Sequence, residues 1–308
     1  MASSQVNTYF AKGIREGLTN TVADLFADDV PFFAMAEKIS AGNTLHEWQE
    51  DSLAAASTTG IVEGASLSYA QPATRTRRKN SCHIRLRNWD VTFTQLAVDV
   101  AGIKDQVARE VMKAMKALLT DYDKIFLNTG NSGAGTTSSA RTAKGIQKAI
   151  STNTGRGSSA GGAVQQALTE AKVNALLQKI WSQGGDPRAL FCHGYQKRVI
   201  SQNFTAKTGF SYRIEASART AINNINRYEG SFGTLDVIPD RQHMLRRITV
   251  VTPDHIKAAV LRDIQQYKGA PTASSVKGWV EAEMTLQWGN EKAHGKQTHL
   301  KTASVAGV

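Results

Sequence analysis

The chain has 308 residues, 41% hydrophobic and 20% charged, and its 37 basic and 26 acidic residues leave a formal net charge of +11. This composition is typical of a folded chain with two domains or one large domain, and two cysteines are too few for a disulfide scaffold. The sequence contains neither the apolar run of about 18 residues that spans a membrane nor the apolar centre of a signal peptide, so we expect no membrane association and reduced thiols.

The first third of the chain is predicted to hold short elements and one long hairpin. Pro31 suits the first position of a short helix, and residues 43–51 fit either a strand or an extended arm. Residues 62–95 are predicted to form a long, partly projecting β-hairpin, with residues 71–74 as turn material. Because the apolar side passes from even to odd positions near residue 88, we expect the strand to enter a second body there or to contain a bulge.

The strongest electrostatic feature is residues 64–89, which contain no acidic residue. Such a basic run fits three partners: nucleic-acid phosphates, the acidic surface of a neighbouring protein, or only solvent around a hairpin tip. No Phe, Tyr or Trp for base stacking lies between the first and last of its cations, which argues against single-stranded nucleic acid. The six cations are Arg75, Arg77, Arg78, Lys79, Arg85 and Arg87.

Apolar residues recur every three or four positions over residues 102–128, which predicts a helix of ~40 Å. A loop rich in Gly, Ser and Thr follows over residues 129–163, with a short helical piece near 144–150. The remainder mixes helices and strands without the regular alternation of a βαβ fold, so the predicted class is α+β. These later elements are helices at about 163–183 and 196–202, and strands at 189–192, 235–239, 248–251 and 279–288.

No set of residues with catalytic chemistry emerges from the motifs. The glycine-rich residues 130–135 lack the ending of a P-loop, and residues 46–50 depart from the HExxH zinc pattern at their last position. Cys82-His83 and Cys192-His193 are adjacent pairs, and neighbours along a strand point to opposite faces, so neither pair is expected to supply a nucleophile and its base. We therefore predict a protein that is not an enzyme, with no catalytic residue, no metal site and no cofactor.

Several segments, in their order and spacing, resemble one protein family over residues 28–300. The sequence resembles the major capsid proteins of tailed bacteriophages with the Hong Kong 97-type (HK97-like) fold. More narrowly, it is similar to the phage capsid family formerly catalogued as a domain of unknown function. The segments that carry the resemblance are Val30-Pro31-Phe32-Phe33 and residues 43–49, 140–145, 173–181, 196–201, 232–239 and 283–295.

The resemblance implies a fold with four named parts. Residues 1–60 would be an N-terminal arm, and residues 61–97 an extended loop formed by the β-hairpin. Residues 98–162 and 251–308 would form a peripheral domain that includes the long spine helix at 102–128, and residues 163–250 would form the central axial domain.

The resemblance also implies a function and a set of partners. The chain would assemble with itself through hexamers and pentamers, in the cytoplasm of the bacterial host, into the icosahedral head of a virion that encloses double-stranded DNA. A portal protein, a possible decoration protein and nonspecific contact with the packaged DNA are expected. A separate scaffolding protein is expected as well, because fewer than 30 residues precede the first matching segment.

Within such a shell, the six basic residues of the hairpin are expected to dock on a neighbouring subunit. Lys79 is the natural candidate for a lysine–asparagine crosslink, but no motif identifies its asparagine, so we expect no covalent crosslink. Two other functions stay open. One is the shell of a cellular compartment, as in encapsulins, which would enclose enzymes in place of DNA. The other is a basic DNA-binding protein that does not assemble.

Overall fold

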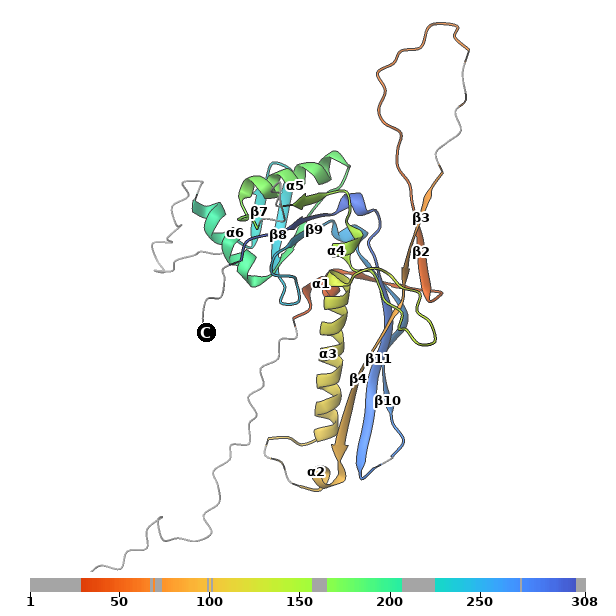
Figure 1. The fold of residues 1–308 in the computed structure, drawn as a ribbon, viewed down its shortest axis with the longest axis vertical. Coiled ribbons are helices and arrows are strands. Elements are labelled where there is room, and N and C mark those ends of the chain that lie inside the picture. The colour runs from red at the N-terminus through yellow and green to blue at the C-terminus, as the bar shows by residue number, and fades with distance from the viewer. Residues whose placement is uncertain are drawn as a thin grey trace, which may run out of the picture.

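The computed structural model divides into an elongated body, a more compact body and a projecting hairpin (Figure 1). The expected arm residues 1–28 and most of the expected turn at 71–74 lie outside the described residues. Among the residues that are described, no helix is both long and apolar enough to cross a bilayer. The described residues are 29–66, 69, 74–98, 100, 102–156, 165–206, 225–271 and 273–302.

The elongated body is a four-stranded sheet with a long helix, α3, along one face (Figure 1). The central strands β10 and β11 pair antiparallel, β4 pairs antiparallel with β11, and β1 adds to β10 in parallel. The prediction at 279–288 thus corresponds to the second half of β11, whereas its long partner β10 was not predicted. The bounds are β1 (Glu37–Ser40), β10 (Lys257–Lys268), β11 (Ser275–Gln287), β4 (His83–Thr92) and α3 (Gln106–Asn128).

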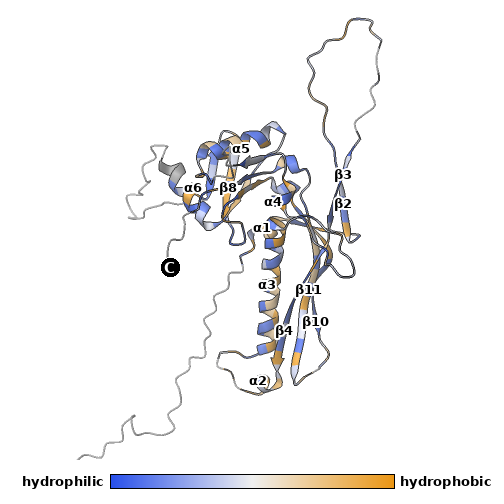
Figure 2. Ribbon diagram, viewed as in Figure 1, coloured by the Kyte–Doolittle hydropathy of each residue, from blue (hydrophilic) through white to orange (hydrophobic). Residues whose placement is uncertain are grey.

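Helix α3 confirms the prediction over 102–128, beginning a few residues later. Asp105 caps it, accepting a hydrogen bond from the backbone N–H of Ala108 at 3.0 Å. Its buried stripe packs against the apolar side of β4 and β11, visible as facing orange segments in Figure 2. The largest of these side chains, Tyr122, is fully buried, and its hydroxyl donates to the carbonyl of Ala282 at 2.6 Å. Apolar burial on this scale is the main stabilising contribution to the elongated body.

The compact body is a six-stranded sheet in the order β5-β12-β9-β6-β8-β7. Helix α5 packs on it through a second apolar core, and α6 lies beside α5 and β8. The predicted strands at 189–192, 235–239 and 248–251 are confirmed, and so are both helices, although α5 begins later than expected. The bounds are β5 (Thr154–Arg156), β12 (Gly295–Thr298), β9 (Ile248–Val251), β6 (Ala189–Cys192), β8 (Gly233–Pro239), β7 (Arg227–Gly230), α5 (Glu170–Ser182) and α6 (Gly194–Ala206).

Short helices complete the two bodies. The predicted helix at Pro31 is α1 (Pro31–Met35), which packs against α3, and the predicted piece near 144–150 is α4 (Ile146–Ala149). Helix α2 (Phe93–Ala97) follows β4 at the far end of the elongated body (Figure 1). Mixed sheets with helices of very different length confirm the α+β class.

The predicted hairpin over residues 62–95 is wrong in its strand pairing. Strand β3 (Thr76–Ser81) pairs antiparallel with β2 (Leu45–Glu50), so the projecting hairpin comprises residues 45–81, with residues 51–75 as its connection. Strand β4, which follows β3 after a break at Cys82, belongs instead to the sheet of the elongated body. Which strands pair depends on tertiary packing between distant segments. The alternation of apolar and polar residues over 62–95 is a local pattern and could not indicate the pairing partner.

The predicted change of face near residue 88 is also wrong. Strand β4 pairs with β11 in a continuous register from His83 to Thr92, and its odd positions face α3 throughout. Arg87 can face the helix because its guanidinium reaches a carboxylate there, Asp121. The apolar side chains of Ile84 and Leu86 lie on the opposite face and are 41% and 49% exposed.

The projecting hairpin is fixed to the elongated body at its base by Asn80, which is fully buried. The Asn80 amide nitrogen donates to the carbonyls of Leu286 at 2.7 Å and Lys144 at 3.1 Å, and its oxygen accepts from the backbone N–H of Lys144 at 2.7 Å. On β2, the Trp48 indole donates to the carbonyl of Gly289 at 2.9 Å and packs edge-on against Trp288. The hairpin therefore leaves the body from a well-anchored base.

Replacing Asn80 by alanine should destabilise the protein by roughly 3 kcal/mol, because it removes three hydrogen bonds and leaves buried backbone groups without partners. Denaturant unfolding of the purified chain measures this change. The neighbouring exposed Lys79→Ala serves as the control and should change the free energy of unfolding by less than about 0.5 kcal/mol. Equal stabilities of the two variants would contradict the anchoring role of Asn80.

A second buried polar group, His294, lies where the 3-10 helix Glu291–Ala293 meets β12. One ring nitrogen, Nε2, donates to the carbonyl of Trp288 at 2.7 Å, and Nδ1 accepts from the backbone N–H of Thr252 at 3.2 Å. Both nitrogens are thus used by the neutral ring. Burial lowers the pKa of His294 from 6.5 to about 4.

The lowered pKa of His294 predicts a loss of stability in acid. The unfolded chain takes up a proton below pH 6.5 and the folded chain does so only near pH 4, so this contribution is complete above pH 6.5 and is lost as the pH falls toward 4. Thermal denaturation between pH 7 and pH 5 should show a smaller loss for His294→Gln than for the unaltered chain. Parallel profiles would contradict this origin of acid sensitivity.

Candidate intersubunit contact hairpin

The basic run on β3 is balanced within the subunit by acidic residues of β2 and of the connection that follows it. Arg78 Nε lies 2.8 Å from Glu50 Oε2, and Arg77 Nη1 lies 3.5 Å from Glu47 Oε2. Arg75 Nε lies 3.2 Å from Asp51 Oδ2. The pairs of Arg75 and Arg77 are exposed and contribute at most about 1 kcal/mol each, whereas the Glu50 side chain that binds Arg78 is only 9% exposed. All three guanidinium groups are themselves exposed and remain available to a second partner.

The six predicted contact residues separate into two groups. Arg75, Arg77, Arg78 and Lys79 lie on or next to β3 in the projecting hairpin, and Lys79 forms no ion pair with any described residue. Arg85 and Arg87 lie on β4 instead, where both Nε atoms donate to Asp121 Oδ2 of α3 at 2.7 Å. Arg87 adds a second bond from Nη2 to Oδ1 at 2.6 Å, so its pairing is bidentate. These two arginines hold the long helix to its sheet.

Sequence reasoning missed the acidic partners of the basic run. Glu47, Glu50 and Asp51 precede it by about 30 residues and pair with it only because β2 lies antiparallel to β3. The signal available in the sequence was the strand-like stretch at 43–51, whose acidic residues are complementary in charge to the basic residues at 75–79. Assigning those two segments to one hairpin would have found the pairs.

The connection of the hairpin carries apolar side chains without cover in the subunit. All residues from 51 to 66 are exposed, and among them Leu53, Ile61 and Val62 are 97%, 75% and 80% exposed. Figure 1 shows this connection extending well beyond both bodies. Apolar residues presented on such a projection are typical of a segment that is covered by a partner.

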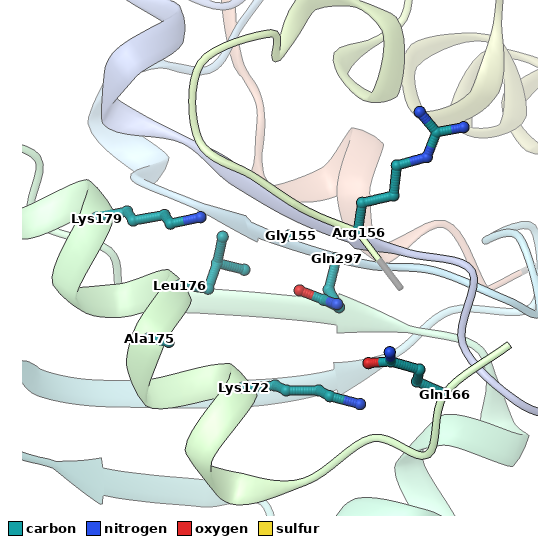
Figure 3. A pocket seen from close by; sticks show the side chains of 8 residues that line it. All are labelled: Gly155, Arg156, Gln166, Lys172, Ala175, Leu176, Lys179 and Gln297. Carbon is teal, nitrogen blue, oxygen red and sulfur yellow. The ribbon is translucent and has the colours of Figure 1, made fainter. Parts of the chain in front are cut away.

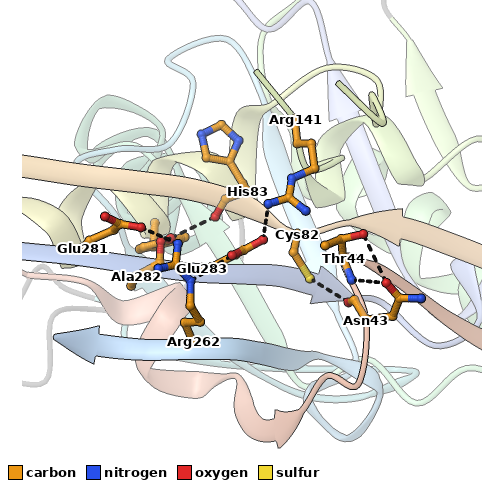
Figure 4. Close-up of polar contacts among 10 residues, drawn as sticks. Asn43, Thr44, Cys82, His83, Arg141, Arg262, Glu281, Ala282 and Glu283 are labelled. Carbon is orange, nitrogen blue, oxygen red and sulfur yellow. Dashed lines mark hydrogen bonds and ion pairs between the residues drawn. The ribbon is translucent and has the colours of Figure 1, made fainter. Parts of the chain in front are cut away.

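The base of the hairpin borders a charged cluster around Glu283 of β11 (Figure 4). Glu283 is nearly fully buried, and its Oε1 lies 2.5 Å from Arg141 Nη2 while Oε2 lies 3.1 Å from Arg262 Nε. Arg262 also pairs with Glu281. The cluster joins β10, β11 and the loop that carries Arg141, and both oxygens of the buried carboxylate are used by cations.

The thiol beside this cluster has no nucleophilic character. Burial and the negative charge of Glu283 raise the pKa of Cys82 to about 11, and its Sγ donates to the carbonyl of Asn43 at 3.5 Å. Burial likewise raises the pKa of Cys192 to about 12. The thiolate is the reactive form of cysteine, so both side chains act as small core residues.

A basic cavity of about 180 Å³ lies between α5 and the edge formed by β5 and β12 (Figure 3). Arg156, Lys172 and Lys179 line it together with the carboxamides of Gln166 and Gln297, and no carboxylate is among its lining residues. The Lys172 and Lys179 amines already donate to backbone carbonyls, at 2.6 and 3.5 Å. Within the described parts of the chain, no three His, Cys, Asp or Glu side chains gather closely enough to hold a metal.

The architecture is similar to that of solved phage structures and of an encapsulin. A capsid chain of cyanophage A-1(L) superposes with a TM-score of 0.71 at 11% identity, covering 94% of this chain and 98% of that one. A chain from Gordonia phage Cozz has a TM-score of 0.63 at 11% identity, and the match covers 94% of this chain and 92% of that one. The SrpI encapsulin of Synechococcus elongatus PCC 7942 has a TM-score of 0.61 at 10% identity, covering 95% of each chain.

At such low identities the similarity shows the fold alone, and phage capsids and an encapsulin share it. No curated protein matches the sequence. The model of the SU10 major capsid protein family does match, over residues 2–301. Because that match spans nearly the whole chain, the chain belongs to the SU10 major capsid protein family, a family of structural virion proteins with no enzymatic role, and it has the α+β fold of HK97-like capsid proteins.

Proposed function

We propose that this major capsid protein builds the icosahedral phage head through hexamers and pentamers, and that the projecting hairpin of each subunit docks on a neighbour. Heterologous contacts that close into rings generate such capsomers. Each contact can be weak, because the effective concentration within a ring makes several weak contacts strong together. The observation that carries the proposal is a hairpin whose connection, residues 51–66, is exposed at every position.

The entropic cost of ordering the exposed connection, residues 51–66, is the second argument for docking on a neighbour. Ordering each residue costs about 1–2 kcal/mol in conformational entropy, and the exposed connection buries little in return within its own subunit. Burial of Leu53, Ile61 and Val62 against a second copy would offset that cost. The anchored base at Asn80 and Trp48 supports the same proposal, because it directs the hairpin away from its own body.

Within the hairpin, we assign docking to the basic residues of β3. The guanidinium groups of Arg75, Arg77 and Arg78 keep donors beyond those used by Glu47, Glu50 and Asp51, and Lys79 adds an unpaired charge among the described residues. Acidic groups of a neighbouring subunit are the matching partner. Arg85 and Arg87 support the contact indirectly, by fixing α3 to β4.

The pairing of the strands supports a revised assignment of the subunit's parts. The extended loop corresponds to residues 45–81, in place of 61–97, and the N-terminal arm ends before it. The peripheral domain contains α3 and the sheet β1-β10-β11-β4. The axial domain contains residues 163–250 and gains β5 and β12, which pair with each other, while β12 also pairs with β9.

The other partners follow from the proposed head. A separate scaffolding protein would guide curvature, a portal would occupy one vertex, and a decoration protein would bind the outer surface. Packaged double-stranded DNA would meet the inner surface through nonspecific phosphate contacts, which the net charge of +11 favours.

Reversing two charges on the hairpin tests docking. Arg77→Glu together with Arg78→Glu should abolish shells of megadalton mass in light scattering and electron microscopy, when the chain is expressed with its scaffolding partner. Arg77→Glu changes an exposed side chain, but Arg78→Glu places a second carboxylate beside Glu50, which is only 9% exposed, so circular dichroism must first show that the double variant is folded.

The matched control restores the pairs within the hairpin. Adding Glu47→Arg and Glu50→Arg to the double variant recreates both cross-strand pairs with opposite polarity. If Arg77 and Arg78 act on a neighbouring subunit, this fourfold variant still fails to assemble. Normal shells from the double variant would refute the proposal, and rescue by the fourfold variant would show that the arginines serve only their own hairpin.

A further inference from the structure

Two aspartates meet in the interior where the two bodies join. Asp123 lies on α3 and is fully buried, and Asp240, which directly follows β8, is 1% exposed. Asp123 Oδ1 accepts the backbone N–H of Phe33 in α1 at 2.8 Å. Asp240 Oδ1 accepts the backbone N–H of Gln242 at 2.7 Å. The pair thus connects α1, α3 and the connection between β8 and β9.

The second oxygen of each carboxyl group has no N–H or O–H donor within the described structure. Asp123 Oδ2 and Asp240 Oδ2 are both buried and both without such a partner, while the two side chains lie within hydrogen-bonding distance of each other. Two ionised carboxylates cannot share so small a volume. A single proton between them satisfies both orphaned oxygens at once.

The surroundings supply little positive charge to offset two anions. Apart from the hydrogen bond with Asp123, the influences that favour the charged form of Asp240 come from the backbone N–H groups of Gln242 and His243 and from the side chain of His193, between β6 and α6. The adjacent Arg241 is turned toward Asp29, with Nε 3.5 Å from Oδ2. From α1 the pair receives the backbone N–H of Phe33. Burial, and then the neighbouring carboxylate, raise the pKa of Asp123 to about 8; burial also raises the pKa of Asp240.

We propose that Asp123 and Asp240 share one proton, and that this proton latches α3 to α1 and to the β8–β9 connection, so that alkaline pH releases the junction between the two bodies. Asp123 holds the proton and donates it to Asp240, an arrangement that leaves Asp123 Oδ1 free to accept from Phe33. Loss of the proton places two negative charges in one buried site. The latch concerns the folded subunit and is independent of hairpin docking.

The sign of the pH dependence follows from the raised pKa of Asp123. The unfolded chain releases this proton near pH 3.8, whereas the folded chain keeps it to about pH 8. The stabilising contribution is therefore complete below pH 3.8, declines as the pH rises, and is lost by the time the pH exceeds about 8. This trend is opposite to that of His294, so a comparison of variants is needed to isolate it.

Asp123→Asn is the decisive variant, because the amide retains an acceptor for Phe33 N–H and a donor for Asp240 but cannot ionise. The melting temperature should be close to that of the unaltered chain near pH 4, should exceed it increasingly as the pH rises to about 8, and should exceed it by a constant amount above that. Asp263→Asn, the same change at an exposed carboxylate of β10, should follow the unaltered chain at every pH. Asp240→Asn should reproduce the effect of Asp123→Asn from the other side of the pair.

Amide hydrogen exchange provides the structural readout. In the unaltered chain, protection of the Phe33 and Gln242 amides should fall at least tenfold between pH 6 and pH 9, after correction for the intrinsic exchange rate. In Asp123→Asn, protection of both amides should stay constant. Parallel melting profiles for the unaltered chain and Asp123→Asn, or unchanged protection at pH 9 in the unaltered chain, would overturn the proposal.

Discussion

The packing of α3 against the long strands β4 and β11 is the constraint on which the other features depend. Tyr122 fills the middle of this contact, and its hydroxyl reaches the carbonyls of both strands, Ala282 of β11 and His83 of β4. Arg85 and Arg87 extend the contact outward to Asp121. Because a buried helix face and two polar links act together, the helix and sheet behave as one rod.

The rod formed by α3 and its sheet sets the direction in which the hairpin projects. Strand β4 continues from β3 after the break at Cys82, so the direction of the hairpin is set by the end of the sheet. Asn80 and Trp48 fix that direction through hydrogen bonds to the carbonyl of Leu286, near the C-terminal end of β11, and to the carbonyl of Gly289, just after the strand. A projecting segment can form a reproducible contact with a neighbour only if its base is rigid, because otherwise docking would also have to order the base.

Local periodicity predicted the elements that have a strong pattern of their own. The apolar stripe of α3 and the short buried strands β6 and β9 were found from residues 102–128, 189–192 and 248–251. Strand β10 was missed because its apolar residues do not alternate: they run together from Ala258 to Leu261, and after them only Ile264 and Tyr267 interrupt a polar, largely exposed stretch. Nothing in its local sequence indicates that β11 holds it in a sheet.

The hairpin was predicted wrongly and the carboxyl pair was missed for the same reason. Both depend on contacts between segments that lie far apart in the sequence. The basic run suggested free charge because its acidic partners on β2 lie far back in the sequence. Arg85 and Arg87 suggested a solvent face because Asp121 belongs to a helix that forms later in the chain. Asp123 and Asp240 belong to no motif in the sequence and lie 117 positions apart, and only the fold buries them together.

The central claim, that the hairpin of one subunit is covered by another in the shell, is tested most directly by limited proteolysis. The same chain is compared as unassembled subunits and as purified shells, and cleavage within residues 51–66 is followed by mass spectrometry. The account predicts rapid cleavage in the unassembled subunit, where every one of these residues is exposed, and strong protection in the shell. Equal cleavage rates in both states would contradict it.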